Sequence, residues 1–291
     1  MKETFDGDTV ALYTIHDEEA LDEMEEKAYL KSYVNYDTNR DFLAVLRHEA
    51  LYAAYVLTEN IEPTNDDPIQ IQQLEDLPEN LNWYNDKLSH PILFNGNIHT
   101  YGICLFNKKC EFSDIVISKK ITKNHTNLIS KEIFKNCDYQ TGPFYNQLHR
   151  LDNFLFYFIT ITKHSPSINV NEMANLVSEE NRRLFKELPN DNVTLGYHIN
   201  EALIDRCIAE FDKNCQLYRL FKSGSRFSKT QLARSCINIG YTADAQNIIV
   251  AEPIKGNLLT GISQEQFFLG APGTRKSIRD KSKFTPDSGL I

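Results

Sequence analysis

The chain has no long uninterrupted run of apolar residues and no internal repeat. No stretch approaches the roughly 20 apolar residues that a membrane-spanning helix needs. The first residues are charged and precede no apolar segment, so a secretory signal peptide is not expected. With 291 residues and 41% hydrophobic content, the chain can bury a real core and form about two domains. Composition therefore predicts a globular protein.

Metal-binding signatures built on sulfur or imidazole are also missing. The six cysteines include no Cys-x-x-Cys pair, so neither a zinc ribbon nor a disulfide framework is indicated. The histidines show no ligand spacing, and no glycine-rich loop of the P-loop type is present. This cysteine usage fits a reducing cytoplasm, and any bound metal is expected to be held through oxygen.

Acidic residues are in excess, but the charge is unevenly distributed. A net charge of −9 is unusual for a protein that acts on nucleic acid. Residues 17–26 hold seven acids and no base, whereas residues 219–234 hold five bases and no acid. Residues 275–283 carry Arg275, Lys276, Arg279 and two further lysines against one aspartate. Each basic segment is either a solvated face or a surface that meets phosphates.

A compact acidic loop is present near the start, where Asp6 and Asp8 flank Gly7. Glycine tolerates backbone angles that other residues resist, so the two carboxylates can point at one ion. A hard cation such as Mg²⁺ prefers such oxygen ligands, and it serves nucleotidyl transfer. The alternative is a surface turn, for which Asp-Gly is a common dipeptide. A predicted strand at residues 9–15 and a helix that opens with acids near residue 17 follow the loop.

The rest of the pattern is mostly helical and predicts an α+β fold. Helices are expected near residues 17–30 and 42–58, a long polar loop over residues 60–82, and short strands within residues 92–120, including 115–117. Two apolar stripes flank a break at residues 189–192 and predict two long helices in an antiparallel hairpin. The stripes contain Met173, Leu176, Val177, Leu184 and Leu188, then Leu203, Cys207, Phe211, Cys215 and Tyr218. These positions are expected to be core packing.

The acidic loop with its strand and helix resembles the metal-binding loop of the largest catalytic subunit (β′) of multisubunit RNA polymerases. In that family an Asp-x-Asp-Gly-Asp loop chelates Mg²⁺, and Asp6 and Asp8 match the second and third ligands. The resemblance makes these two the expected catalytic and metal-binding residues. Thr4 stands where the family has its first aspartate, and a neutral hydroxyl cannot replace a carboxylate's charge. Either the native start differs, another chain supplies an oxygen, or the site is degraded.

Segments near the end resemble the same family in the same order. Residues 223–232 are similar to the F-loop behind the active centre, and residues 261–268 to the segment that leads into the bridge helix. The bridge helix itself, which crosses the cleft beside the RNA 3′ end, is matched within residues 273–290. The resemblance places these side chains close to nucleic acid or substrate: Arg226, Arg275, Lys276, Arg279, Thr285 and Gly289. Pro286 and Leu290 depart from the family pattern, and a proline inside a helix is expected to kink it.

The resemblance also divides the chain into parts. Residues 99–107 resemble a Thr-x-Gly-Arg-x-x-(Phe/Leu)-Asn signature, with Ile103 in place of its arginine. The expected parts are the end of a double-psi β-barrel (1–60), a pore or linker region (61–140), a funnel with a rim-helix hairpin (141–222), the F-loop and connector (223–271), and the first part of the bridge helix (272–291).

The function implied by the resemblance is that of a DNA-directed RNA polymerase subunit, active only within a complex. Its expected partners are other β′ fragments, β-type subunits, DNA template, RNA product and nucleoside triphosphates, with Mg²⁺ as cofactor and no membrane. Because the sequence ends inside the predicted bridge helix, it is expected to be a middle fragment of a β′ subunit split among several bacteriophage genes. It would then act in the cytoplasm of an infected bacterium or be packaged in the virion.

Three alternatives remain at this point. The first is a catalytically inactive structural subunit, which Thr4 and Pro286 favour. The second is a more distant two-barrel polymerase that copies RNA or works without a β-type partner. The third is an unrelated helical interaction protein.

Overall fold

The computed structural model describes residues 14–27, 41–167, 169–189 and 192–290. The chain divides into two compact units. We call Asp17–Ser167 with Arg219–Phe227 the core region, and Met1–His16, Ile168–Tyr218 and Ser228–Ile291 the carboxy-terminal region.

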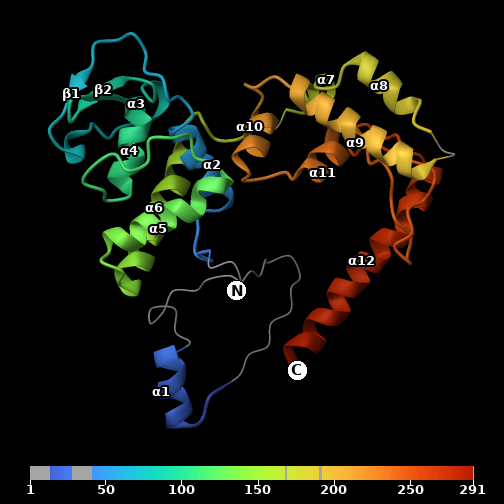
Figure 1. Cartoon of the computed structure of the whole chain (residues 1–291), viewed down its shortest axis with the longest axis horizontal. Helices are drawn as coiled ribbons and strands as arrows, with labels where there is room; N and C mark the ends of the chain where they lie inside the picture. The colour runs from blue at the N-terminus through green and yellow to red at the C-terminus, as the bar shows by residue number, and fades with distance from the viewer. Residues whose placement is uncertain (1–13, 28–40, 168, 190–191, 291) are drawn as a thin grey trace. The chain divides into compact units, whose positions relative to one another are not determined.

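Helices predominate in both regions (Figure 1). Those that lie wholly in the core region are α1 (Glu18–Lys27), α2 (His48–Leu57), α3 (Leu81–Asp86), α4 (Tyr101–Lys109), α5 (Thr126–Asn136) and α6 (Thr141–Ile161). Those that follow are α7 (Val170–Asn175), α8 (Glu179–Lys186), α9 (Val193–Glu210), α10 (Gln216–Ser223), α11 (Lys229–Leu232) and α12 (Gln264–Leu290). The prediction of a mostly helical α+β fold is confirmed. None of the described helices is both long enough and apolar enough to cross a bilayer.

A small mixed sheet of three strands lies in the core region, in the order β1-β2-β3. The strands are β1 (Ile69–Gln70), β2 (Pro91–Phe94) and β3 (Asn97–Thr100). β1 pairs with β2 in parallel, and β2 pairs with β3 antiparallel, with Ile92 opposite His99. Asn95 and Gly96 form the tight turn between β2 and β3, both with positive φ, as two-residue hairpins require.

The predicted double-psi barrel has no counterpart among the described residues, whose only sheet is this open one. Residues 9–13 of its expected strand lie outside the described part, and Thr14 and Ile15 are not in a strand.

Helix α2 is the centre of the core region. Its residues from Ala50 to Leu57 are all buried, and it packs against α4 and α6. Gly102 makes the approach of α4 possible, because a Cβ at this position would lie 2.0 Å from the carbonyl oxygen of Leu57. Thr100 donates a hydrogen bond from Oγ1 to the carbonyl oxygen of Asn60 at 3.0 Å. The glycine and threonine of the signature at residues 99–107 therefore serve packing.

The asparagine of that signature also explains an incorrect prediction. Residues 115–117 are not a strand. The backbone amides of Val116 and Ile117 instead donate to Oδ1 of Asn107, at 3.0 and 2.8 Å, and the amide of Asn107 donates to the carbonyl oxygen of Ile117. Because this buried side chain already satisfies their backbone groups, the β-branched residues have no need of a partner strand.

The predicted helical hairpin is only partly correct. The first long helix is divided into α7 and α8, because Ser178 begins a new helix by accepting a hydrogen bond at Oγ from the amide of Asn181. The second stripe is shared between α9 and α10, which a break at residues 211–215 separates. The prediction of core packing is confirmed for six of the stripe residues, which are buried: Met173, Val177, Leu188, Cys207, Phe211 and Cys215.

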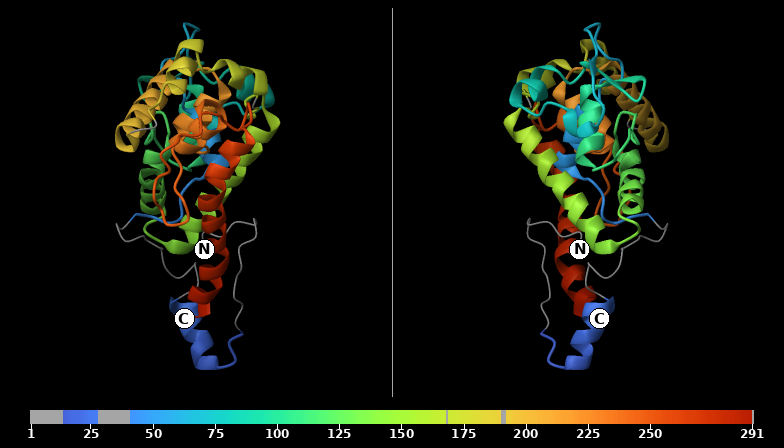
Figure 2. Two further views of the ribbon diagram at one scale, coloured as in Figure 1. Left: turned by 90° about the vertical axis from the view of Figure 1, so that its right-hand side faces the viewer. Right: turned by 90° about the vertical axis from the view of Figure 1, so that its left-hand side faces the viewer.

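Helix α12 is continuous in Figure 1 and in both views of Figure 2. It begins well before Gly273, because Ser263 and Gln266 cap each other's backbone amides at 3.2 and 3.3 Å. The helix runs on through Pro272 and Pro286, so neither proline ends it, and the kink at Pro286 stays a prediction.

Candidate functional site

The residues predicted to bind Mg²⁺ lie outside the described part of the chain. Thr4, Asp6 and Asp8 all precede residue 14, so their proposed roles stay predictions. Among the residues that the structure describes, no group of three or more histidines, cysteines, aspartates or glutamates could hold a metal ion. The remaining predicted site residues fall on a loop after α10 and on α12.

The loop at the end of α10, residues 223–227, begins with the last residue of that helix and has a tightly bonded backbone, and we call it the glycine loop. Gly224 has a φ of +74°, a conformation that glycine adopts without strain. Ser223 Oγ donates to the carbonyl oxygen of Leu220 at 2.9 Å and lies 2.8 Å from Ser225 Oγ. Both serines are buried, so hydrogen bonds within the protein fix the conformation of the loop.

Arg226, at the outer part of the loop, forms an ion pair with Glu49. Its Nη2 lies 2.6 Å from Glu49 Oε1, and the two side chains are 49% and 44% exposed. Partial burial raises the pKa of Glu49, but the hydrogen bond and charge of Arg226 outweigh it and leave the pKa below its ordinary value. Arg226 is therefore paired with a carboxylate in this structure, at a site that water and anions can reach.

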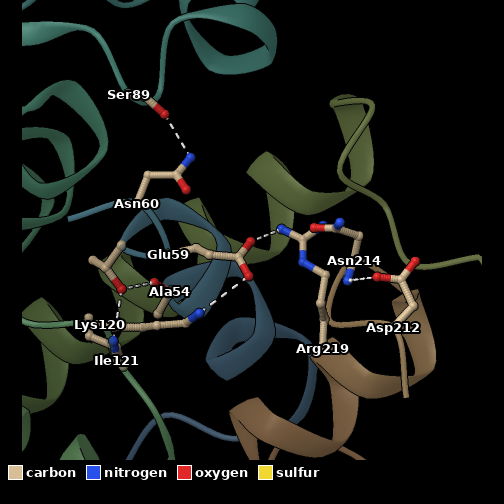
Figure 3. Close-up of polar contacts among 10 residues, drawn as sticks. Ala54, Glu59, Asn60, Ser89, Lys120, Ile121, Asp212, Asn214 and Arg219 are labelled. Atoms are coloured by element: carbon tan, nitrogen blue, oxygen red, sulfur yellow. Dashed lines mark hydrogen bonds and ion pairs between the residues drawn. The ribbon is translucent and has the colours of Figure 1, made fainter. Parts of the chain in front are cut away.

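A second ion pair ties α10 to the other end of α2. Figure 3 shows the carboxylate of Glu59, just beyond α2, between Lys120 and Arg219. Lys120 Nζ lies 3.3 Å from one carboxylate oxygen and 4.3 Å from the ring centre of Tyr55, while Arg219 Nη2 contacts the other oxygen. Burial raises the pKa of the nearby Tyr52, although the charge of Arg219 opposes this.

Beyond the loop, Ser228 begins α11 with reciprocal caps between its side chain and that of Gln231. Lys229 contacts two carboxylates of α9, Glu201 at 2.9 Å and Asp205 at 2.7 Å. Helix α11 passes directly into a π-helical turn, η3 (Ala233–Ile237). Three cations of the basic run at residues 219–234 are thus neutralised by acids of the same chain: Arg219, Arg226 and Lys229.

Helix α12 has one face fixed and one face open. A Cβ on Gly273 would lie 2.1 Å from the carbonyl oxygen of Ala243. Glycine therefore lets the helix contact the connector, by which we mean residues 238–263 between η3 and α12. Lys276 Nζ donates to Asn247 Oδ1 at 3.0 Å on the same connector. Arg275 and Arg279, four residues apart and hence on one face, are exposed. Thr285 and Gly289 lie further along the helix.

Sequence reasoning missed the two glutamates that hold the loop. Glu49 and Glu59 sit in or beside an apolar helix, and their partners are 177 and 160 residues away. No spacing rule connects residues so far apart. The one available signal was that each is an isolated acid beside an otherwise apolar helix.

No protein-family model matches the chain. Curated relatives do. The β′ subunit of DNA-directed RNA polymerase from Caldanaerobacter subterraneus subsp. tengcongensis is 31% identical over 116 residues, which cover 40% of this chain and 9% of the relative. The β′ subunit from Thermoanaerobacter pseudethanolicus is 28% identical over 123 residues, or 41% of this chain and 10% of the relative.

One match extends along almost the whole chain. The β′ subunit from Fusobacterium nucleatum is 21% identical over 311 aligned residues, which cover 99% of this chain and 23% of the relative. The chain thus spans between about a tenth and a quarter of the length of these relatives. It is similar, at a distance, to bacterial RNA polymerase β′ subunits.

Proposed function

We propose that this chain is one subunit of a bacteriophage DNA-directed RNA polymerase and carries part of its Mg²⁺-dependent nucleotidyl-transfer site. The observation that carries the proposal is the similarity to a β′ subunit over 99% of the chain. Segments that resemble the metal loop, the F-loop and the bridge helix occur within it in the family's order. The continuous helix α12, with exposed Arg275 and Arg279, supports the proposal for the last of these.

In this proposal, Asp6 and Asp8 hold the Mg²⁺ ion, which when bound activates the RNA 3′ hydroxyl and offsets charge on the leaving group. Arg275, Lys276 and Arg279 supply positive charge where phosphates are met, and Thr285 and Gly289 lie beside substrate on the same helix. Arg226 reaches phosphate by exchanging its contact with Glu49, a partly exposed pair that is inexpensive to break.

The partners in this proposal are the remaining β′ fragments, β-type subunits, DNA template, RNA product and nucleoside triphosphates. The chain is a middle fragment of a split β′ subunit, made in the cytoplasm of the infected bacterium or packaged in the virion.

A second candidate is a structural subunit of such a polymerase without catalytic function. The observation that favours it is Thr4, which removes one carboxylate from the expected metal loop. The two candidates differ in whether RNA synthesis depends on Asp6 and Asp8.

The experiment is extension of RNA on a primed template by the polymerase assembled from all its chains. Asp6→Ala and Asp8→Ala are each expected to lower extension by about 10²-fold or more, since each removes a charged metal ligand. Asp22→Ala, an exposed acid of α1, is the matched control and should extend normally. Thr4→Asp should lower the Mg²⁺ concentration needed for half-maximal rate. Undiminished extension by both alanine variants, with assembly intact, would favour the structural subunit.

A further inference from the structure

The glutamate at the end of α2 is held between two cations from distant parts of the core region (Figure 3). Glu59 is 21% exposed, Arg219 is 16% exposed and Lys120 is 34% exposed. Both carboxylate oxygens are occupied, one by each cation. Because this pair is largely withdrawn from water, loss of one partner leaves the other charge uncompensated. This contact is therefore harder to open than the exposed pair of Glu49 and Arg226.

The contact at Arg219 continues directly into the glycine loop. The next residue, Leu220, is buried, and its carbonyl oxygen accepts three hydrogen bonds from the loop. The donors are Ser223 Oγ at 2.9 Å, Ser225 Oγ at 3.3 Å and the amide of Arg226 at 3.4 Å. The conformation of the loop is thus fixed relative to the last turn of α10.

The segment that carries Lys120 also contacts the loop. A Cβ on Gly224 would lie 2.6 Å from Cβ of Lys123, so the loop backbone is in close contact with this segment. The segment is itself hydrogen-bonded to the end of α2. Thr58 Oγ1 accepts a hydrogen bond from the backbone amide of Ile121 at 2.9 Å and donates one to the carbonyl oxygen of Ala54 at 2.8 Å. Segment 120–123 therefore contacts both the loop, at Lys123, and α2, at Thr58.

We propose that Glu59 is a positioning residue, which, by binding Arg219 and Lys120 together, holds α10 and segment 120–123 in the arrangement that sets the position of the glycine loop. It touches no reacting atom and acts through Arg219. The part of this inference that concerns catalysis rests on the proposed function, in which the loop stands behind the nucleotidyl-transfer site. A displaced loop should then slow bond formation more than it weakens nucleotide binding.

The test has two readouts on the same variants. The first is amide hydrogen exchange in the full-length chain, read on peptides that cover residues 220–227. Glu59→Gln and Arg219→Gln are each expected to speed exchange there about tenfold or more, and the double variant should be no faster than either single one. Arg219→Lys, which keeps the cation, should restore part of the protection. Glu111→Gln, which breaks the exposed pair with Arg150, is the matched control and should leave these peptides unchanged.

Exchange in α4, which is buried in the core region, reports whether the fold is intact. If residues 220–227 keep their protection in Glu59→Gln, or if the two single effects add in the double variant, Glu59 does not position the loop. If α4 also loses protection in Glu59→Gln, the fold itself is disturbed, and the milder Arg219→Lys variant is used instead. Faster exchange of residues 220–227 than in wild type, with α4 unchanged, then supports the proposal, and unchanged exchange there overturns it.

The second readout is extension by the assembled polymerase. Glu59→Gln is expected to lower the rate at saturating nucleotide by about tenfold with little change in KM, and Arg219→Lys should recover part of it. If residues 220–227 exchange faster in Glu59→Gln but RNA extension by that variant is normal, the catalytic part of the inference is overturned. Failure of the proposed function is recognised separately, by normal extension in Asp6→Ala and Asp8→Ala, and the exchange result stands whichever way that assay falls.

Discussion

The core region and the carboxy-terminal region differ in how much apolar surface each withdraws from water. The core region has one continuous cluster of buried side chains from α2, α4, α5 and α6, the sheet and the residue Leu220. In the carboxy-terminal region the described buried apolar residues are fewer, and α12 leaves Phe267, Phe268 and Ile278 exposed. Phe268 is 70% exposed.

We infer from this difference that the two regions obtain their stability from different sources. Burial of apolar area is the dominant favourable term in folding, so the core region should be stable on its own interactions. The carboxy-terminal region, with less burial, should depend more on helix caps and on its side-chain hydrogen bonds. Each region has its own reporter: Trp83, the single tryptophan, lies in the core region, and Cys207, Cys215 and Cys236 are buried in the other.

The largest effect is expected from Phe144→Ala. Phe144 is fully buried, and its ring centre lies 5.5 Å from that of Phe42 and 5.3 Å from that of Phe134. Loss of this ring should lower the free energy of unfolding of the core region by about 3–5 kcal/mol. Urea unfolding followed by Trp83 fluorescence measures it. Phe156→Ala, at an exposed position of the same helix, should change it by less than about 0.5 kcal/mol.

Alkylation of Cys207 and Cys236 in the Phe144→Ala variant tests whether the regions are independent. Burial raises the pKa of these thiols to about 11 and about 12, so they react slowly while the carboxy-terminal region is folded. Unchanged alkylation is expected. Alkylation that rises together with the loss of core stability would show that the two regions unfold as one.

A smaller effect is expected from the partly buried charge cluster around Glu79. Its carboxylate lies 2.7 Å from Lys108 Nζ and 2.5 Å from Lys109 Nζ, and it accepts from the hydroxyl of Tyr84 at 3.1 Å. Burial raises the pKa of Glu79, but the two lysines outweigh it and the pKa falls below its ordinary value. Glu79→Gln should therefore lower the stability of the core region by about 1–3 kcal/mol at pH 7.

The pH dependence of that difference follows from the sign of the shift. A carboxyl group whose pKa is lowered by folding stabilises the fold above its unfolded pKa, and this contribution is lost as the pH falls through the folded pKa. Wild type and Glu79→Gln should thus converge below about pH 4. Urea midpoints by Trp83 fluorescence at a series of pH values measure this. A gap that persists undiminished at low pH would assign the loss to packing.

Sequence reasoning performed well where the signal is local. The helical class, α2 and the burial of Cys207 follow from periodicity within one or two turns, and α1 follows from the acids of its first turn. It failed at residues 115–117, because β propensity does not reveal that the buried side chain of Asn107 binds their backbone.

The candidate site shows the same limit more strongly. The glycine loop was located by its own residues, but its anchors Glu49 and Glu59 could not be, since only the fold brings them to Arg226 and Arg219. The metal loop, which carried the functional prediction, lies outside the described residues, so Asp6 and Asp8 remain predictions.

In the carboxy-terminal region a helix cap is expected to make a measurable contribution to stability. Ser178 Oγ accepts the amide of Asn181 at 3.3 Å and begins α8. Ser178→Ala should cost about 1 kcal/mol and speed alkylation of Cys207 and Cys236 about fivefold, with Trp83 fluorescence unaffected. Ser178→Asp, which keeps an accepting oxygen, is the control. Alanine and aspartate variants that behave alike would show that the cap is not what stabilises this region.

The smallest effect is expected from an exposed ion pair of the core region. Arg150 Nη2 lies 3.0 Å from Glu111 Oε1, but the two side chains are 64% and 49% exposed. Water stabilises the two separated charges almost as well as the ion pair does. Arg150→Gln should therefore change the free energy of unfolding by less than about 0.5 kcal/mol. The urea midpoint by Trp83 fluorescence, at low and at high salt, measures this. A loss above about 1 kcal/mol that disappears in salt would mean that surface charge contributes to the core region on the scale of its partly buried cluster at Glu79. The core region would then depend on polar surface contacts as well as on burial.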